Sequence, residues 1–146
     1  MRPRLVLDTN TVLALWMFHD PRLRILRDWI EADTCVLCAR ADALNELQLV
    51  LAYRQFALDT LTQQRLLQDY RARVEVSAAV VVPDTRTLPV CRDADDQKFL
   101  EITAEAGASS LITRDKALLR LARHRLLHRR FSILTPEHFL SQLLMG

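Results

Sequence analysis

Glycine is almost absent from this 146-residue chain, in which Gly107 and Gly146 are the only two. A GxGxxG dinucleotide loop or a P-loop needs at least two glycines close together, because the backbone must approach the phosphates of a nucleotide. Neither motif is possible here. The scarcity of glycine therefore excludes nucleotide-dependent enzymes of these two kinds.

Cysteine is also scarce, and the three residues Cys35, Cys38 and Cys91 form no disulfide framework. Cys35 and Cys38 have the spacing of a redox pair, but they lie in a stretch that reads as a strand, where residues three apart point to opposite faces. We interpret them as small buried apolar residues. An odd cysteine count fits a reducing compartment, so we expect a cytoplasmic protein.

No long apolar run is present. Asp8 interrupts the N-terminal apolar stretch, no cleavage-like segment follows, and residues 12–18 are too short to cross a membrane. We therefore expect neither a secretory signal nor membrane attachment. The net charge of +2 identifies no partner, but 18 of the 20 basic residues are arginine. Arginine pairs well with phosphate, although codon bias explains the excess equally well.

The length predicts a single domain over residues 1–146, and half of the residues are hydrophobic, which excludes a disordered chain. Short apolar runs alternate with helical patterns. The predicted strands are residues 4–8, 34–38, 77–82 (ended by Pro83), 110–113 and 131–134. The predicted helices are residues 11–18, 21–31, 39–54, 95–106 and 116–128, with a last helix that begins at Pro136. Another helix is predicted after the capping box at residues 60–63, and it carries Leu67, Tyr70 and Val74.

Strands with continuous apolar runs, separated by helices, are typical of a parallel sheet with helices on both faces. We therefore predict an α/β fold with three layers, α/β/α. Ligands of such sheets bind beyond the carboxyl ends of the strands.

Acidic residues recur at that predicted edge. Asp8 follows the first strand and Asp115 follows the fourth, while the loop that bears Asp93 and Asp96 leaves the third strand at the same edge. Glu46 lies about two turns into the helix after the second strand and can lean over the same crevice. Clustered carboxylates repel one another unless a cation binds them. Mg²⁺ and Mn²⁺ favour oxygen ligands and can activate water towards a phosphodiester.

Each acid taken alone has a second interpretation. Asp8 and Asp115 are also suited to capping the helices that follow them, and Asp93 or Asp95 is suited to capping the next helix. Glu46 is equally consistent with a solvated helix position. The joint placement at one sheet edge favours a metal site, and Asp95 is the acid that we assign most readily to capping alone.

The ordered set LDTN, NEL, CRDADDQKFLEITAEAGA and LITRDKALL resembles PIN-domain ribonucleases, and in particular the VapC-like toxin components of bacterial toxin–antitoxin modules. The resemblance spans nearly the whole chain. It implies a sheet of about five strands in the order 3-2-1-4-5 and a Mg²⁺- or Mn²⁺-dependent endoribonuclease. It also implies a small antitoxin protein as partner and a homodimer.

By this resemblance, Asp8, Glu46, Asp96 and Asp115 are the core catalytic and metal-binding acids, and Asp93 is an added metal ligand. Thr9, Asn10 and Thr113 are supporting polar groups. Ala94 and Gln97 depart from the subgroup pattern, in which proline and a further acid are common, and this leaves the number of bound ions open.

Basic and aromatic residues give further candidates. Arg92, Arg114 and Arg123 are candidate RNA contacts, and Arg86 and Arg92 flank the proline-bearing loop. His124 and His128 have helical zinc-ligand spacing, but the arginines around them favour RNA phosphate or a solvated helix face. Trp16, Met17 and Phe18 are assigned to the core, with a dimer surface or an antitoxin groove as the alternative.

Three functions compete at this stage. The first is a toxin that cleaves RNA by metal-activated water. The second is a non-catalytic RNA-binding or scaffolding module on the same fold, which would gain nothing from clustered acids. The third is a phospho-accepting signalling domain, which would need a lysine after the fifth strand, and none follows FSIL.

Overall fold

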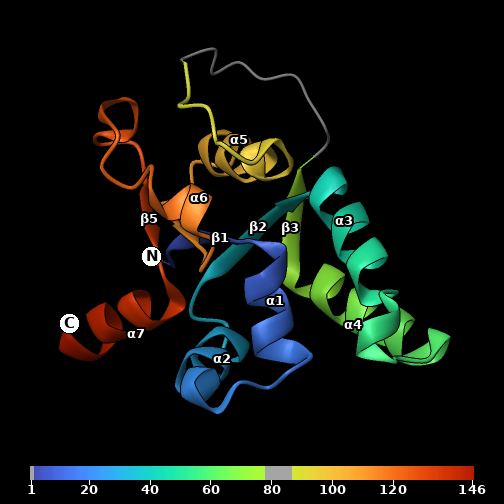
Figure 1. Cartoon of the computed structure of the whole chain (residues 1–146). Coiled ribbons are helices and arrows are strands. Elements are labelled where there is room, and N and C mark those ends of the chain that lie inside the picture. Colours follow the sequence, from blue (N-terminus) through green and yellow to red (C-terminus); the bar gives the residue numbers. More distant parts are fainter. Residues whose placement is uncertain (1, 78–86) are drawn as a thin grey trace.

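A computed structural model describes residues 2–77 and 87–146 of the chain and shows a five-stranded sheet with helices on both faces (Figure 1). All strand pairs in the sheet are parallel, and the strand order is β3-β2-β1-β4-β5. The strands are β1 (Arg4–Leu7), β2 (Val36–Arg40), β3 (Val74–Ser77), β4 (Ser110–Ile112) and β5 (Ser132–Leu134). The predicted fold class and strand order are confirmed.

The α-helices are α1 (Thr9–Trp16), α2 (Arg24–Glu31), α3 (Ala41–Leu51), α4 (Thr60–Arg73), α5 (Gln97–Glu105), α6 (Lys116–Leu119) and α7 (Pro136–Met145). Short 3-10 turns are η1 (Pro21–Leu23), η2 (Arg54–Phe56), η3 (Ala94–Asp96) and η4 (Arg125–Leu127). Asp or Thr side chains cap several helices, as at Asp59 before α4 and Thr135 before α7.

Alternate residues of each inner strand point to two separate apolar cores. Leu5 and Leu7 of β1 pack into the core made with α1, α2, α3, α4 and α7, whereas Val6 packs into the core made with α5 and α6. The same alternation separates the two neighbouring cysteines, because Cys35 lies in the first core and Cys38 in the second. Both thiols are buried and free, which confirms their assignment as apolar filling.

The third strand lies earlier than predicted. It was expected at residues 77–82, but β3 is Val74–Ser77, so Val74 begins a strand rather than ending a helix. As an edge strand, β3 is half exposed and has no continuous apolar run to mark it. Residues 78–86, which include the rest of the predicted strand, Pro83 and Arg86, lie outside the described residues.

The helix predicted over residues 116–128 is wrong. The chain forms only the four-residue α6, followed by turns and η4. No side chain in residues 119–126 is buried. Leu119 and Leu121 pack only partly against the second core, so this segment buries too little apolar surface to stabilise a long helix by packing.

Other predicted helices are shortened by 3-10 turns or strand residues. The helix expected over residues 21–31 starts with η1, and the one over residues 39–54 loses Ala39 and Arg40 to β2. The helix expected from residue 95 begins with η3 and continues as α5. Within residues 2–77 and 87–146, no helix is both long enough and apolar enough to span a bilayer.

Candidate functional site

The register of the sheet brings Asp8 and Thr113 to the same level. Leu7 of β1 pairs with Ile112 of β4, so the next residue of each strand leaves the sheet at its carboxyl edge. The Thr113 hydroxyl donates a hydrogen bond of 2.5 Å to Asp8 Oδ2, and both side chains are buried. Asp8 Oδ1 accepts from the Thr11 backbone N–H at 3.0 Å and so caps α1.

Burial raises the pKa of the Asp8 carboxyl above its ordinary value. The hydrogen bonds from Thr11 and Thr113 lower the pKa, and the nearby charge of Asp115 raises it further. The ionised form of Asp8 is therefore costly in the absence of a cation. Capping and a role in the site are compatible, since one carboxylate serves both.

Asp115 follows β4 and caps α6. Its Oδ1 accepts hydrogen bonds from the backbone N–H groups of Ala117 at 2.8 Å and Leu118 at 3.3 Å. The Asp115 backbone N–H donates to the Thr113 hydroxyl oxygen at 2.9 Å. Thr113 thus contacts both Asp8 and Asp115 and holds the two strand ends together.

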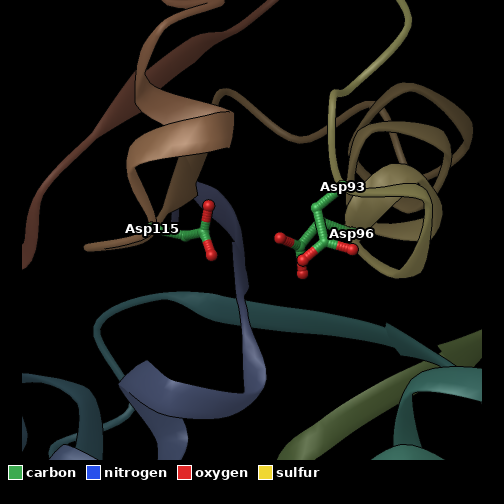
Figure 2. A group of neighbouring side chains, drawn as sticks. All are labelled: Asp93, Asp96 and Asp115. Atoms are coloured by element: carbon green, nitrogen blue, oxygen red, sulfur yellow. The ribbon is translucent and has the colours of Figure 1, made fainter.

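Asp93 and Asp96 come from the opposite side, at the turn before α5. Asp93 accepts a hydrogen bond from the Asp95 backbone N–H at 3.0 Å and caps η3. One carboxylate oxygen from each of Asp93, Asp96 and Asp115 lies within 4.8 Å of the others. Figure 2 shows Asp93 and Asp96 pointing from the α5 side towards Asp115 at the start of α6. Asp93 and Asp115 are 22 residues apart in sequence, and the three acids belong to two separate segments.

Within the part of the chain that the structure describes, Asp96 has an unpartnered buried oxygen and a strongly raised pKa. Its Oδ2 is buried and has no hydrogen-bond partner among the described residues. Burial, the charge of Asp115 and a hydrogen bond between the Asp96 and Asp115 carboxyl groups, followed by the charges of Asp93 and Asp8, raise the pKa of Asp96 to about 7. A hard divalent ion would supply the absent partner and relieve the repulsion, so the donor set fits Mg²⁺ or Mn²⁺.

One pocket of about 240 Å³ gathers the four acids that were predicted to be the core of the site. Its lining includes Asp8, Glu46, Asp96 and Asp115. The supporting residues Thr9 and Asn10 also line it, together with side chains from the end of α3, the link after it and η2: Val50, Tyr53, Gln55 and Phe56. The sequence signal did not indicate this aromatic wall, because Tyr53 and Phe56 lie far from the acidic motifs in the chain.

Glu46 has two polar partners. The ammonium group of Lys98, the second residue of α5, lies 2.6 Å from Glu46 Oε1, and the Thr9 hydroxyl donates to Glu46 Oε2. Sequence reasoning missed Lys98. Two features of the sequence could have indicated a role for Lys98. It lies two residues after Asp96, and it is one of only two lysines in an arginine-rich chain.

Gln97, which departs from the expected acid, has a structural role. Its side-chain oxygen accepts from the Cys91 backbone N–H at 2.7 Å, and its side-chain amide donates to the Pro89 carbonyl at 3.1 Å. A carboxylate could not donate the second bond. Gln97 therefore fixes the loop that leads into Asp93.

The three candidate RNA-binding arginines differ in their surroundings. Arg114 pairs with Asp20 at 3.1 Å and with Glu137, so its guanidinium is engaged within the protein. Arg92 and Arg123 are exposed, and Arg123 lines a basic hollow beside α6. His124 caps η4 by accepting from the Leu126 N–H, and the segment between it and His128 is a 3-10 turn rather than an α-helix. The helical zinc pair considered from the sequence therefore lacks its geometry.

Comparisons with known proteins agree on the fold. The model of a family described as "PIN domain" matches residues 4–117. A crystal structure of PAE2754 from Pyrobaculum aerophilum is similar, with a TM-score of 0.61 and 17% sequence identity. The similarity covers 99% of this chain and 91% of that one, and at this identity it shows the fold alone. No match was found among curated proteins.

Proposed function

Because this chain belongs to the PIN-domain family, which is typically a nuclease family, we propose that it is a divalent-metal-dependent endoribonuclease. The observation that carries the proposal is the convergence of Asp93, Asp96 and Asp115, with one buried oxygen of Asp96 left without a partner. Gathered carboxylates repel one another, and a bound cation relieves this repulsion.

The ion would be held by Asp93, Asp96 and Asp115, with Asp8 beside them in the pocket. When bound, Mg²⁺ or Mn²⁺ would activate a water molecule and offset the charge that develops on the phosphodiester. Asp115 would keep its fixed orientation because its Oδ1 is tied to two backbone N–H groups of α6. Thr113 would orient Asp8, and Asn10 would offer a polar contact at the open side of α1.

The side chains that form the walls of this pocket suit RNA as a substrate. Tyr53 is about half exposed, and its ring stacks on that of Phe56 at a centroid distance of 6.1 Å. Exposed rings next to a phosphate-cleaving centre suit the flat faces of unpaired bases. Exposed Arg92 and Arg123 would add contacts to backbone phosphates.

We further propose that the protein is the toxin of a type II toxin–antitoxin module, a single cytoplasmic domain over residues 1–146 that forms a homodimer. The support is the sequence resemblance, together with an apolar hollow of about 260 Å³ among α1, α3 and α4 that suits an antitoxin segment. Trp16, Met17 and Tyr70 line this hollow. Phe18 and Leu49 are exposed and lie close in sequence to residues of the hollow, and we propose them as dimer contacts.

The decisive experiment measures cleavage of an unstructured RNA by the wild type with Mn²⁺, with Mg²⁺ and with a chelator. We expect cleavage with either ion and none with the chelator. Asp96→Asn should abolish it, whereas the matched control Asp95→Asn should not, because the exposed Asp95 side chain lies outside the cluster. RNA binding without metal-dependent cleavage would instead support the non-catalytic binding module.

A further inference from the structure

The contact between Lys98 and Glu46 carries an inference that the family membership does not supply. Lys98 Nζ lies 2.6 Å from Glu46 Oε1, with 17% and 26% of the two side chains exposed. The same ammonium donates to the Asp95 carbonyl and lies 5.1 Å from the centre of the Phe99 ring. Three contacts of different kinds therefore hold the Lys98 charge in one place.

Both oxygens of Glu46 have a partner in this arrangement. Lys98 contacts its Oε1, and the Thr9 hydroxyl donates to its Oε2. Glu46 is also outside the group of three aspartates whose oxygens converge. A metal ion bound to Glu46 would lie beside the Lys98 ammonium, and the two positive charges would repel each other.

Sites with two metal ions hold them roughly 4 Å apart, and the second ion needs carboxylates of its own. Beyond the three converging aspartates, the pocket offers Asp8 and Glu46. Asp8 is buried at 3% exposure, whereas 26% of the Glu46 side chain is exposed. Glu46 is therefore the more accessible of the two carboxylates, and a second ion would depend on it most.

We propose that Lys98 occupies Glu46 as a built-in cation and thereby restricts the site to a single divalent ion. Lysine suits this role because its ammonium is a compact point charge, comparable to an ion, whereas arginine presents a wide planar fork. The chain uses arginine for 18 of its 20 basic residues, but not here. Lys98 is then a positioning residue, which holds Glu46 and, through it, the Thr9 hydroxyl next to Asp8.

This inference rests on the proposed metal site, and the test separates the two. Full-length metal-free protein is titrated with Mn²⁺ by calorimetry, and the same samples are examined by electron paramagnetic resonance for coupled Mn²⁺ pairs. The wild type should bind one ion and show no coupled pair. Lys98→Met removes the charge while keeping the length of the side chain, and it should bind two ions with a coupled spectrum.

Three further variants define the cause. Lys116→Met removes the other lysine, which is exposed on α6 and is not the lysine paired with Glu46, and this variant should keep one ion. Glu46→Gln should also keep one ion. The double variant Lys98→Met/Glu46→Gln should return from two ions to one, because the second ion loses its carboxylate. A merely structural role of Lys98 would not produce this reversal.

The contradicting results are distinct. A wild type that binds two ions, or a Lys98→Met protein that folds and binds one, would overturn the role of Lys98 while leaving the nuclease proposal intact. A wild type that binds no ion would overturn the metal site itself. If Lys98→Met does not fold, Glu46→Gln decides: loss of the single ion would show that Glu46 is a direct ligand, and its retention would support the inference.

Discussion

Thr113 Oγ1 lies 2.5 Å from Asp8 Oδ2, and this contact connects residues that are 105 positions apart in the chain. It exists because β1 and β4 are parallel neighbours whose ends stand in register. The same hydroxyl accepts the Asp115 backbone N–H, so one small side chain orients two acids of the candidate site. Threonine suits this position because its hydroxyl can donate and accept at once.

Replacement of Thr113 by valine should destabilise the protein. The buried Asp8 oxygen would lose its donor, at a cost of roughly 1 to 3 kcal/mol, which urea unfolding can measure. Thr103→Val is the matched control, because the Thr103 hydroxyl donates to the Phe99 carbonyl within α5. Thr103→Val should lower the free energy of unfolding by less than Thr113→Val. Equal decreases for the two variants would contradict a special role for Thr113.

Stability of the metal-free protein should fall as pH rises from about 4 to about 7. Burial and neighbouring charges raise the pKa of Asp96 from 3.8 to about 7, so the folded state holds a proton that the unfolded state releases. Over this window the unfolded state gains relative stability through Asp96. Thermal unfolding with a chelator at a series of pH values should show this decrease in stability with pH, and Asp96→Asn should reduce its slope. An unchanged slope in that variant would rule out Asp96 as its source.

Arg40 should contribute to stability far from the metal cluster. Its buried guanidinium contacts Asp42 at 2.6 Å, Glu101 at 2.9 Å and Glu105 at 2.8 Å, and so joins the start of α3 to α5. Arg40→Met should cost about 2 kcal/mol in the free energy of unfolding, since charged hydrogen bonds are lost and three acids are left facing one another. The exposed Arg22, paired with Asp20, is the control. Arg22→Met should change stability little.

Loss of the Tyr53 ring should weaken RNA binding. In an Asp96→Asn background, in which RNA should stay intact, Tyr53→Ala should raise the Kd for a labelled single-stranded RNA by roughly 5- to 100-fold, as expected for one lost stacking contact. Leu61→Ala removes an exposed apolar side chain of α4 that does not line the pocket. Fluorescence anisotropy would contradict the stacking role if both variants bound RNA equally.

Much of the fold could be predicted from the sequence because inner strands of a parallel sheet are continuous apolar runs. The runs around Leu5, Leu37 and Leu111 were identified this way, and so was the sheet edge at which Asp8 and Asp115 meet. The acids follow directly from where these strands end. Their proposed roles as ligands remain predictions.

What the sequence did not reveal depends on contacts between distant segments. The leucines after Asp115 have helical spacing, but only Leu118 and Leu127 in that stretch are buried, so the long helix does not form. Lys98 reads as an ordinary surface residue until α3 brings Glu46 against it. The edge strand at Val74 is short and half exposed, and no one-dimensional pattern distinguishes it from the end of α4.

The most direct measurement is anomalous diffraction from crystals grown with Mn²⁺, at a concentration that supports RNA cleavage. The account predicts an anomalous peak among the carboxylates of Asp93, Asp96 and Asp115, in contact with Asp96 Oδ2. It also predicts that the peak disappears in Asp96→Asn. Crystals grown at this Mn²⁺ concentration that show no anomalous peak at these three side chains would contradict the account.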